Sequence, residues 1–373
     1  MPEIILKNVT KKFGDFVAVD NLSMTIKDGD FITLLGPSGC GKTTTLRMIA
    51  GLETPTEGDI LIDGKVVFSA EHGVNVTPDK RNVGFLFQNY ALWPHMTVYQ
   101  NISFGLENMK WNKDRIKARV QEIVEMLEIE QFQERYPNEL SGGQQQRVAI
   151  ARTLAPGPKV LFMDEPLSNL DAKLRMDMRT ELKRLHVETG STFVYVTHDQ
   201  LEAMTLSTKI CLLKEGVLNQ YEPPLDIYNR PINTFVADFV GNPTMNFIDA
   251  KATNVNFDEI KVEFNGVNTL FQPSDGQVTL SENQEVILGV RPEYIKISEK
   301  GSLVGKIYST LPSGLETVVK VDFEGLILTV VVFGDVDFIV DEELRFDFTG
   351  DRCILFDKDT KEFITQGSLT VVT

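Results

Sequence analysis

"FITLLGPSGCGKTTTLRMIAG", residues 31–51, is the most informative stretch of this 373-residue chain. The stretch begins with an apolar run that is typical of a buried strand, continues through a glycine-rich loop and ends with helical spacing. Its middle part matches the pattern G-x-x-x-x-G-K-[ST], in which backbone N–H groups freed by the glycines surround a phosphate group. Because a strand before the loop and a helix after it are the context that this pattern requires, the sequence predicts a nucleotide-binding P-loop.

Two side chains of this loop have specific expected roles. Lys42 would reach the β- and γ-phosphates, and the hydroxyl of Thr43 would coordinate Mg²⁺. The other residues expected to surround the nucleotide are Gly36, Pro37, Ser38, Gly39, Cys40, Gly41 and Thr44. Cys40 occupies a variable position of the pattern, so we assign it no redox role.

Polar residues also stand at the ends of three other strand-like runs. Asp164 ends "VLFMD", where it would hold Mg²⁺ through water, and Glu165 comes next, pointing toward the place of an attacking water. His198 follows "FVYVT", and Gln88 follows "VGFLF". Taken singly, each could be a structural or surface residue, but ligands of open α/β sheets bind at the carboxyl ends of strands. Together they predict a catalytic site beside the P-loop, with Glu165, His198 and Gln88 as the catalytic candidates.

The organisation of the chain changes near residue 240. Up to that point strand-like runs alternate with helical stretches, such as residues 113–132, where apolar side chains recur every three or four positions. This alternation predicts an α/β domain over residues 1–240, built on a parallel sheet. After "GNPTMNF" (residues 241–247) short β-rich runs are broken by Gly, Asn, Asp and Pro, so residues 241–373 are expected to form an all-β barrel or sandwich.

Composition and charge narrow the possible functions. The chain carries 37 Lys and Arg against 53 Asp and Glu, a formal net charge of −16. After Gly241 there are 11 basic and 22 acidic residues, so the β-rich part alone carries −11. Such an acidic surface disfavours nucleic acid as a partner, because phosphate backbones attract Lys and Arg. The sequence has no long apolar run and no signal-peptide pattern, and its 3 scattered cysteines are expected to be reduced thiols.

A second stretch is unusual enough to need an explanation. "LSGGQ" (residues 140–144) sets a serine and two glycines before a helix, and the free N–H groups at such a helix start form an anion site. The P-loop, Gln88, "LSGGQ", the strand-end acids, "SNLD" (residues 168–171) and His198 occur together and in this order. In this combination the chain resembles the nucleotide-binding subunits of ATP-binding cassette (ABC) transporters, over residues 4–240.

The resemblance implies a P-loop NTPase cassette with a helical subdomain at about residues 89–155, and it implies ATP and Mg²⁺ as cofactors. Gln88 would sense the attacking water and would contact the metal, together with Thr43 and Asp164. Phe13 would stack on the adenine ring; the alternative is that Phe13 is only a hydrophobic residue at a strand end.

The resemblance also implies that two cassettes face each other head to tail, so that each closes on the ATP held by the other. The residues that would reach the neighbour's nucleotide are Ser141, Gly142, Gly143 and Gln144, and Asp171 would communicate across the dimer. One chain carries one cassette, so a homodimer or a pair with a similar chain is expected.

Separate membrane subunits are a further expectation. Two permease subunits would carry the solute across the membrane, an extracytoplasmic solute-binding protein would take part indirectly, and this chain would lie in the cytoplasm on the inner face. In the family, the segment after Gln88 lines the groove that receives a permease helix. The apolar residues of that segment fit this groove or the protein core equally well: Tyr90, Leu92, Trp93 and Met96.

The β-rich tail is similar to the C-terminal regulatory domain of sugar-importer ATPases, an OB-like barrel that contacts its twin. "GNPTMNF" and "GVRPEYIKI" (residues 289–297) carry this resemblance. We therefore expect ATP hydrolysis coupled to the import of a sugar or oligosaccharide. The alternatives are an ATPase of a polyamine, iron or sulphate importer, a soluble cassette protein acting on DNA or ribosomes, and an inactive regulatory subunit.

Overall fold

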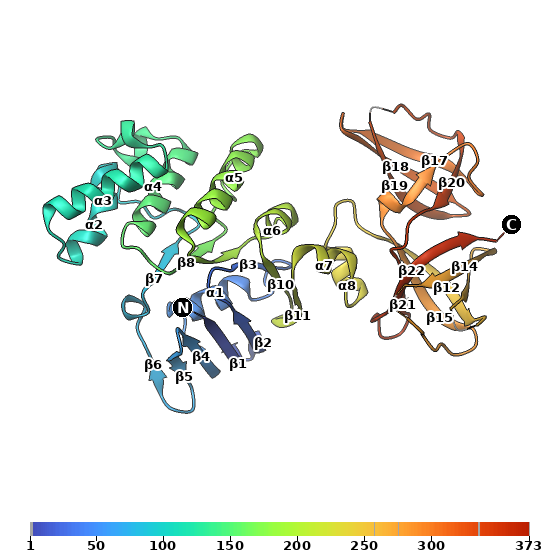
Figure 1. Cartoon of the computed structure of the whole chain (residues 1–373), viewed down its shortest axis with the longest axis horizontal. Coiled ribbons are helices and arrows are strands. Elements are labelled where there is room, and N and C mark those ends of the chain that lie inside the picture. Colours follow the sequence, from blue (N-terminus) through green and yellow to red (C-terminus); the bar gives the residue numbers. More distant parts are fainter. Residues whose placement is uncertain (1–2, 257, 275, 335, 373) are drawn as a thin grey trace. The chain divides into compact units, whose positions relative to one another are not determined.

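The computed structural model of the chain describes residues 3–256, 258–274, 276–334 and 336–372. The chain forms two compact units, Met1–Pro224 and Leu225–Thr373 (Figure 1). The units divide earlier than the domain limit expected at residue 240, because α8 (Thr234–Phe239) and nearly all of α7 (Pro224–Asn229) belong to the second unit. Within the described residues, no helix is long and apolar enough to cross a lipid bilayer.

A six-stranded sheet forms the centre of the first unit. Its strand order is β11 (Val217–Glu222), β10 (Lys209–Lys214), β3 (Phe31–Leu35), β9 (Thr192–Val196), β8 (Val160–Asp164) and β7 (Val83–Leu86). Neighbouring strands are parallel except β10 and β11, which are antiparallel. Every residue of β3, β8 and β9 is buried, as expected for parallel strands covered on both faces. The structure confirms the α/β class that the sequence predicts.

Helices follow the carboxyl ends of the parallel strands, at one edge of this sheet. Strand β3 leads through the P-loop into α1 (Lys42–Ala50), and β9 leads into α6 (Gln200–Leu206). The long helix α5 (Ala172–Thr189) ends at Gly190, which has φ 59° and forms a left-handed C-cap, a conformation that glycine adopts readily. The carboxyl ends of β3, β7, β8 and β9 therefore carry the candidate site.

Two peripheral layers complete the first unit, and they lie on opposite sides of it in Figure 1. One is an antiparallel sheet, in the order β2 (Phe16–Ile26), β1 (Ile4–Phe13), β4 (Glu57–Ile62), β5 (Lys65–Ser69) and β6 (Val74–Asn75). The other is the helical region α2 (Val98–Asn108), α3 (Lys113–Met126) and α4 (Gly142–Leu154). Helix α3 buries Ile116, Val120, Ile123 and Val124, the face that its apolar spacing predicts.

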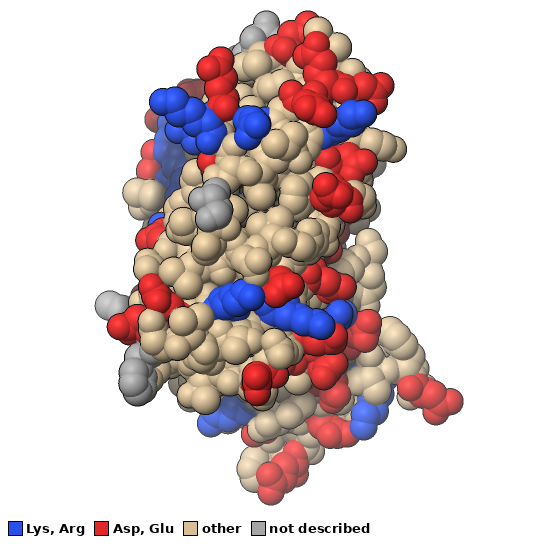
Figure 2. All heavy atoms as spheres, turned by 90° about the vertical axis from the view of Figure 1, so that its right-hand side faces the viewer, with Lys and Arg blue, Asp and Glu red and all other residues tan. Residues whose placement is uncertain are grey.

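The second unit consists of two β-structures. A closed barrel has the order β12 (Asn246–Asn254), β13 (Ile260–Phe264), β14 (Val267–Pro273), β22 (Phe363–Val371), β21 (Cys353–Asp357) and β15 (Gln284–Val290). A five-stranded sheet has the order β16 (Ile295–Ile297), β20 (Glu343–Phe348), β17 (Leu303–Pro312), β18 (Glu316–Phe323) and β19 (Leu326–Phe333). The expected all-β tail is thus a barrel with an added sheet. Figure 2 shows one face of the molecule, where acidic side chains gather around a broad uncharged area.

A buried arginine explains why α7 and α8 belong to the second unit. Arg291 is 2% exposed and donates hydrogen bonds to the carbonyl oxygens of Ala237 (2.9 Å), Val240 (2.6 Å) and Tyr228 (2.9 Å). Its guanidinium also lies 4.0 Å from the centroid of the Tyr228 ring. Because a buried charge needs partners, this side chain joins the "GVRPE" turn to the segment that contains both helices.

Candidate nucleotide site

The P-loop is folded in a conformation that requires glycine at two positions. Gly36 has φ 147° and Gly41 has φ 97°, both in the region that side-chain-bearing residues avoid. A Cβ atom at Gly36 would overlap the carbonyl oxygen of Leu213, and one at Gly41 would overlap that of Ala18. The glycines of the motif therefore let the loop lie directly against two neighbouring backbone segments.

Lys42 is buried at the base of this loop. Its ammonium group donates to the carbonyl oxygens of Gly36 (2.7 Å) and Pro37 (2.9 Å) and lies 3.8 Å from Sγ of Cys40. Burial raises the pKa of the Cys40 thiol, and the Lys42 charge only partly opposes this effect. The thiol is thus protonated at neutral pH, which makes it a poor nucleophile.

Thr43 and Asp164, which are expected to share a metal ion, contact each other directly. The Thr43 hydroxyl donates to Oδ1 of Asp164 at 2.9 Å, and Nη2 of Arg47 lies 3.5 Å from Oδ2 of the same carboxylate. Burial raises the pKa of Asp164, while the Thr43 hydrogen bond and the Arg47 charge oppose the rise. Arg47 is a residue that sequence reasoning missed, although its position four residues after Thr43 on α1 was an available signal.

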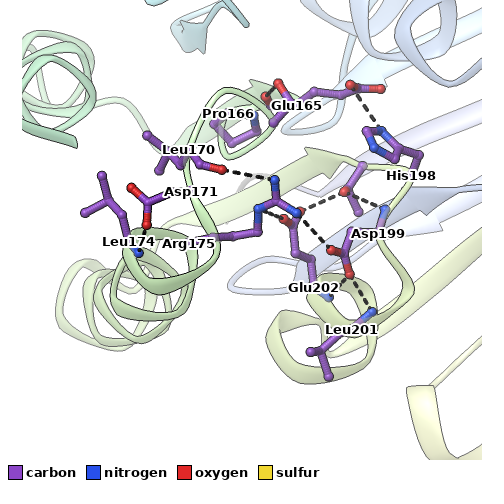
Figure 3. Close-up of polar contacts among 12 residues, drawn as sticks. Glu165, Pro166, Leu170, Asp171, Leu174, Arg175, His198, Asp199, Leu201 and Glu202 are labelled. Carbon is purple, nitrogen blue, oxygen red and sulfur yellow. Dashed lines mark hydrogen bonds and ion pairs between the residues drawn. The ribbon is translucent and has the colours of Figure 1, made fainter. Parts of the chain in front are cut away.

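Glu165 and His198 lie side by side at the ends of the neighbouring strands β8 and β9. Oε2 of Glu165 is 3.3 Å from Nδ1 of His198 (Figure 3). Glu165 has φ 45°, and its N–H donates to the carbonyl oxygen of Val196 at 3.0 Å. The left-handed backbone turns the carboxylate away from the direction that a continuing strand would give it. The His198 side chain is 59% exposed, so the pair is open to a ligand.

Gln88 lies near the same edge but contacts a different segment. Its Nε2 donates to the Ser168 hydroxyl at 3.4 Å, and its backbone carbonyl accepts from Nδ2 of Asn169 at 3.1 Å. Gln88 is therefore held by the "SNLD" turn, next to the strand-end acids.

A pocket of about 340 Å³ lies in front of the P-loop. It is lined by Phe13, Phe16, Ala18, Ser38, Gly39, Gly41, Lys42, Thr43, Thr44 and Glu165. Phe13 and Phe16 are 47% and 62% exposed, and Nζ of Lys11 lies 4.6 Å from the Phe13 ring centroid. Phe16 was missed by sequence reasoning, since only the β1–β2 turn brings it beside Phe13.

The "LSGGQ" stretch is outside the lining of this pocket and forms the start of α4. The Ser141 hydroxyl accepts from the N–H of Gln144 (3.4 Å), and the Gln144 side chain accepts from the N–H of Ser141 (2.9 Å). This capping box fixes the helix start. A Cβ at Gly143 would come within 2.8 Å of the Leu174 side chain, whereas one at Gly142 would make ordinary contact with Leu170.

Asp171 caps the neighbouring helix α5. Its carboxylate accepts from the N–H of Leu174 at 3.0 Å, and this is the cap that starts the helix. The structure thus brings "LSGGQ" and "SNLD" together through Leu170 and Leu174, and neither stretch contributes to the lining of the pocket.

The segment after Gln88 is held by α4. Arg152 donates to the carbonyl oxygens of Tyr90 (2.7 Å) and Ala91 (2.6 Å), and its guanidinium lies 4.8 Å from the centroid of the Trp93 ring. Tyr90 is buried and its hydroxyl donates to the carbonyl oxygen of Pro166 at 3.4 Å. Tyr90 is therefore a core residue. Leu92, Trp93 and Met96 are partly exposed, so for them both the groove and the core stay open.

These features define a P-loop nucleotide-binding protein of the cassette class: one loop for a phosphate, two acids and a histidine beside it, and a capped "LSGGQ" helix. The comparisons with known proteins agree. The family "ABC transporter" matches residues 19–168, and "MalK OB fold domain" matches residues 241–295.

Relatives match over nearly the whole length. The chain is 42% identical to the maltose/maltodextrin import ATP-binding protein MalK of Vibrio vulnificus, over 96% of both chains. It is 50% identical to the trehalose/maltose import ATP-binding protein MalK of Thermococcus litoralis, over 79% of this chain and 78% of the relative.

A similar solved structure is the dimeric post-hydrolysis state of the ATP-binding cassette MJ0796 bound to ADP and Pi. It has a TM-score of 0.52 and 37% identity, and covers 59% of this chain and 98% of its own. The chain therefore belongs to the family of ABC transporter ATP-binding proteins and is an ATPase of that family with a C-terminal OB-fold domain.

Proposed function

We propose that this protein is the ATP-hydrolysing subunit of an importer for a sugar or oligosaccharide. The support for the sugar is that relatives matching along almost the whole chain are named for maltose, maltodextrin and trehalose import. The OB-fold domain of the MalK type at residues 241–295 supports the same substrate class over polyamines, iron or sulphate.

The observation that carries the catalytic proposal is the contact between Glu165 and His198 beside the P-loop pocket. Glu165 acts as the general base that takes a proton from the attacking water, because its carboxylate lines the pocket. His198 orients that carboxylate and contacts the reacting phosphate. Gln88 lies near the same edge and positions the water.

The nucleotide is held by the chain's own backbone and side chains. The residues 36–44 surround the phosphates, Lys42 exchanges its two carbonyl partners for phosphate oxygens, and Phe13 stacks on the adenine. Phe16, at the same wall of the pocket, adds a second aromatic surface.

The donor set beside Thr43 fits Mg²⁺. The Thr43 hydroxyl and the Asp164 carboxylate are hard oxygen donors 2.9 Å apart, and Mg²⁺ usually binds one or two carboxylates together with substrate phosphates and water. Gln88 can supply a third oxygen. When bound, the ion supplies positive charge that stabilises the phosphate oxygens.

A second copy completes each site. Ser141, Gly142, Gly143 and Gln144 of one chain close on the γ-phosphate held by the other, and Asp171 lies at the contact between the two. The start of α4, with a capping serine and two glycines, is suited to an anion. Two permease subunits bind the segment after Gln88, hold the dimer at the inner face of the membrane, and receive solute from an extracytoplasmic binding protein.

Transport measurements test this proposal. Deleting the gene should abolish ATP-dependent uptake of maltose, trehalose or a maltodextrin while leaving spermidine, iron and sulphate uptake unchanged. Complementation with the wild-type gene should restore sugar uptake, and complementation with the Lys42→Ala gene should not. Loss of spermidine uptake alone would show that the transported substrate is a polyamine and not a sugar.

A further inference from the structure

Arg175 links two loops that meet at the candidate site. It lies one turn into α5, and its Nη2 donates to the carbonyl oxygen of Leu170 at 3.2 Å. Its Nη1 donates to Oδ2 of Asp199 at 3.5 Å, and its Nε lies 3.9 Å from Oε1 of Glu202 (Figure 3). Leu170 directly precedes Asp171, and Asp199 directly follows His198. The Arg175 guanidinium thus contacts the residue before Asp171 and the residue after His198.

The acceptors on the His198 side are themselves fixed. Oδ1 of Asp199 caps α6 by accepting from the N–H groups of Leu201 (2.8 Å) and Glu202 (3.1 Å). Glu202 is 3% exposed, and its carboxylate accepts from the hydroxyls of Tyr195 (2.8 Å) and Thr197 (2.7 Å). The Asp199 N–H also donates to the Thr197 hydroxyl at 3.0 Å. Asp199 and Glu202 are therefore hydrogen-bonded to residues on both sides of His198.

The other acceptor of Arg175, the Leu170 carbonyl, belongs to the turn of residues 168–171, which follows β8. Ser168 donates its hydroxyl to the Glu165 carbonyl at 2.8 Å, and Asp171 caps α5. The turn of residues 168–171 is therefore tied to Glu165 at its start and to Arg175 at its end. An isolated surface ion pair contributes little, but Arg175 joins a carbonyl and two carboxylates that lie on different segments.

We propose that Arg175 is a positioning residue that couples the 168–171 turn to His198. When the partner cassette displaces the turn, the Arg175 guanidinium transmits that displacement to Asp199. The position of Asp199 in turn fixes His198 against Glu165, the arrangement in which Glu165 assists the attack of water. The inference rests on the proposed roles of Glu165 and of the dimer, and it adds a link that acts through other residues rather than on substrate.

The test separates turnover from nucleotide affinity. Arg175→Ala should lower kcat for ATP by about tenfold or more while leaving KM within about threefold, because the P-loop pocket is untouched. Arg175→Lys should be impaired as well, since one ammonium cannot replace the planar fork that serves Leu170 and Asp199 together. Arg184→Ala is the matched control, because Arg184 pairs with Glu181 and Glu188 of its own helix and donates to the Met126 carbonyl. It should keep kcat.

A double-mutant cycle covers the case in which Arg175→Ala does not fold. Asp199→Asn keeps a capping oxygen and removes the charge, so the double variant with Arg175→Lys should lose no more kcat than the worse single variant. Additive losses, normal kcat in folded Arg175 variants, or equal changes in kcat and KM would overturn the coupling. Glu165→Gln is measured in parallel. If this variant hydrolyses ATP normally, the proposed general base is wrong. If it is inactive while the Arg175 variants keep normal kcat, only the proposed role of Arg175 is refuted.

Discussion

Nδ1 of His198 lies 3.3 Å from Oε2 of Glu165, and this contact joins the carboxyl ends of two adjacent parallel strands. It depends on the backbone of Glu165, whose φ of 45° ends β8 abruptly. A residue that continued the strand would place its side chain elsewhere. The geometry of the pair is therefore a property of the strand end, and a substitution that preserves the shape of Glu165 can probe its chemistry alone.

Glu165→Gln is the first test. The amide has nearly the same shape but cannot accept a proton from water, so we expect ATP hydrolysis to fall about 10²- to 10⁴-fold. ATP affinity should stay close to that of the wild type, and the ATP-bound dimer should accumulate. Turnover and nucleotide binding measured on the same preparation decide the matter, and near-normal turnover would exclude Glu165 as the base.

A mixed dimer tests whether "LSGGQ" acts on the neighbour's nucleotide. Pairing a Lys42→Ala chain with a Ser141→Arg chain should create one site with both defects and one site with neither. If each chain instead completed its own site, both sites would carry one defect. Nucleotide occupancy per purified mixed dimer, compared with both parent homodimers, distinguishes the two arrangements. Two equally impaired sites would contradict the proposed exchange.

The P-loop glycines predict a graded response to alanine. Gly36→Ala forces a Cβ against the Leu213 carbonyl in addition to the strain of φ 147°, so we expect at least a tenfold loss of ATP affinity, about 1.4 kcal/mol or more. Gly39→Ala carries only the strain of φ 80°, because nothing lies within 4 Å of its added Cβ. Its loss should be smaller. Equal losses in equilibrium binding would show that contact with Leu213 is irrelevant.

Stability against acid should depend on His186. Its ring packs against Phe31 and Phe193, its Nε2–H donates to the Gly29 carbonyl at 2.9 Å, and burial lowers its pKa below the ordinary 6.5. Below about pH 6.5 the unfolded chain takes up a proton that the folded chain resists, so stability is lost as pH falls. His186→Gln should therefore lose less unfolding free energy in urea between pH 7 and pH 5. Parallel slopes for wild type and variant would contradict this.

The sequence predicted those parts of the site that depend on local pattern. The P-loop, Asp164, Glu165 and His198 could be found because each follows an apolar run, and a parallel sheet must bring the ends of such runs to one edge. The limits of β3 and β8 agree with the apolar runs themselves.

The parts that could not be predicted depend on contacts between distant segments. Phe16 lines the pocket together with Ser38 and Gly39 of the P-loop. Arg175 and Arg152 look like ordinary helix-surface arginines in a sequence, although they contact Asp199 and Tyr90. The division of the chain before residue 240 likewise depends on Arg291, more than fifty residues beyond the two helices it holds. The hydrophobic periodicity of a sequence does not indicate such hydrogen-bond partners, because the acceptors come close to the side chain only in the folded state.

Helix α4 has a mechanical consequence. Ser141 caps its first turn, Arg152 near its other end holds the carbonyls of Tyr90 and Ala91, and the 13 residues between Gly142 and Leu154 span about 20 Å at 1.5 Å per residue. A hydrogen-bonded helix of this length resists both stretching and compression, so a displacement of its serine end is transmitted to its arginine end. If Ser141 is drawn toward a nucleotide on a second copy, as proposed, the helix should carry the stretch after Gln88 with it.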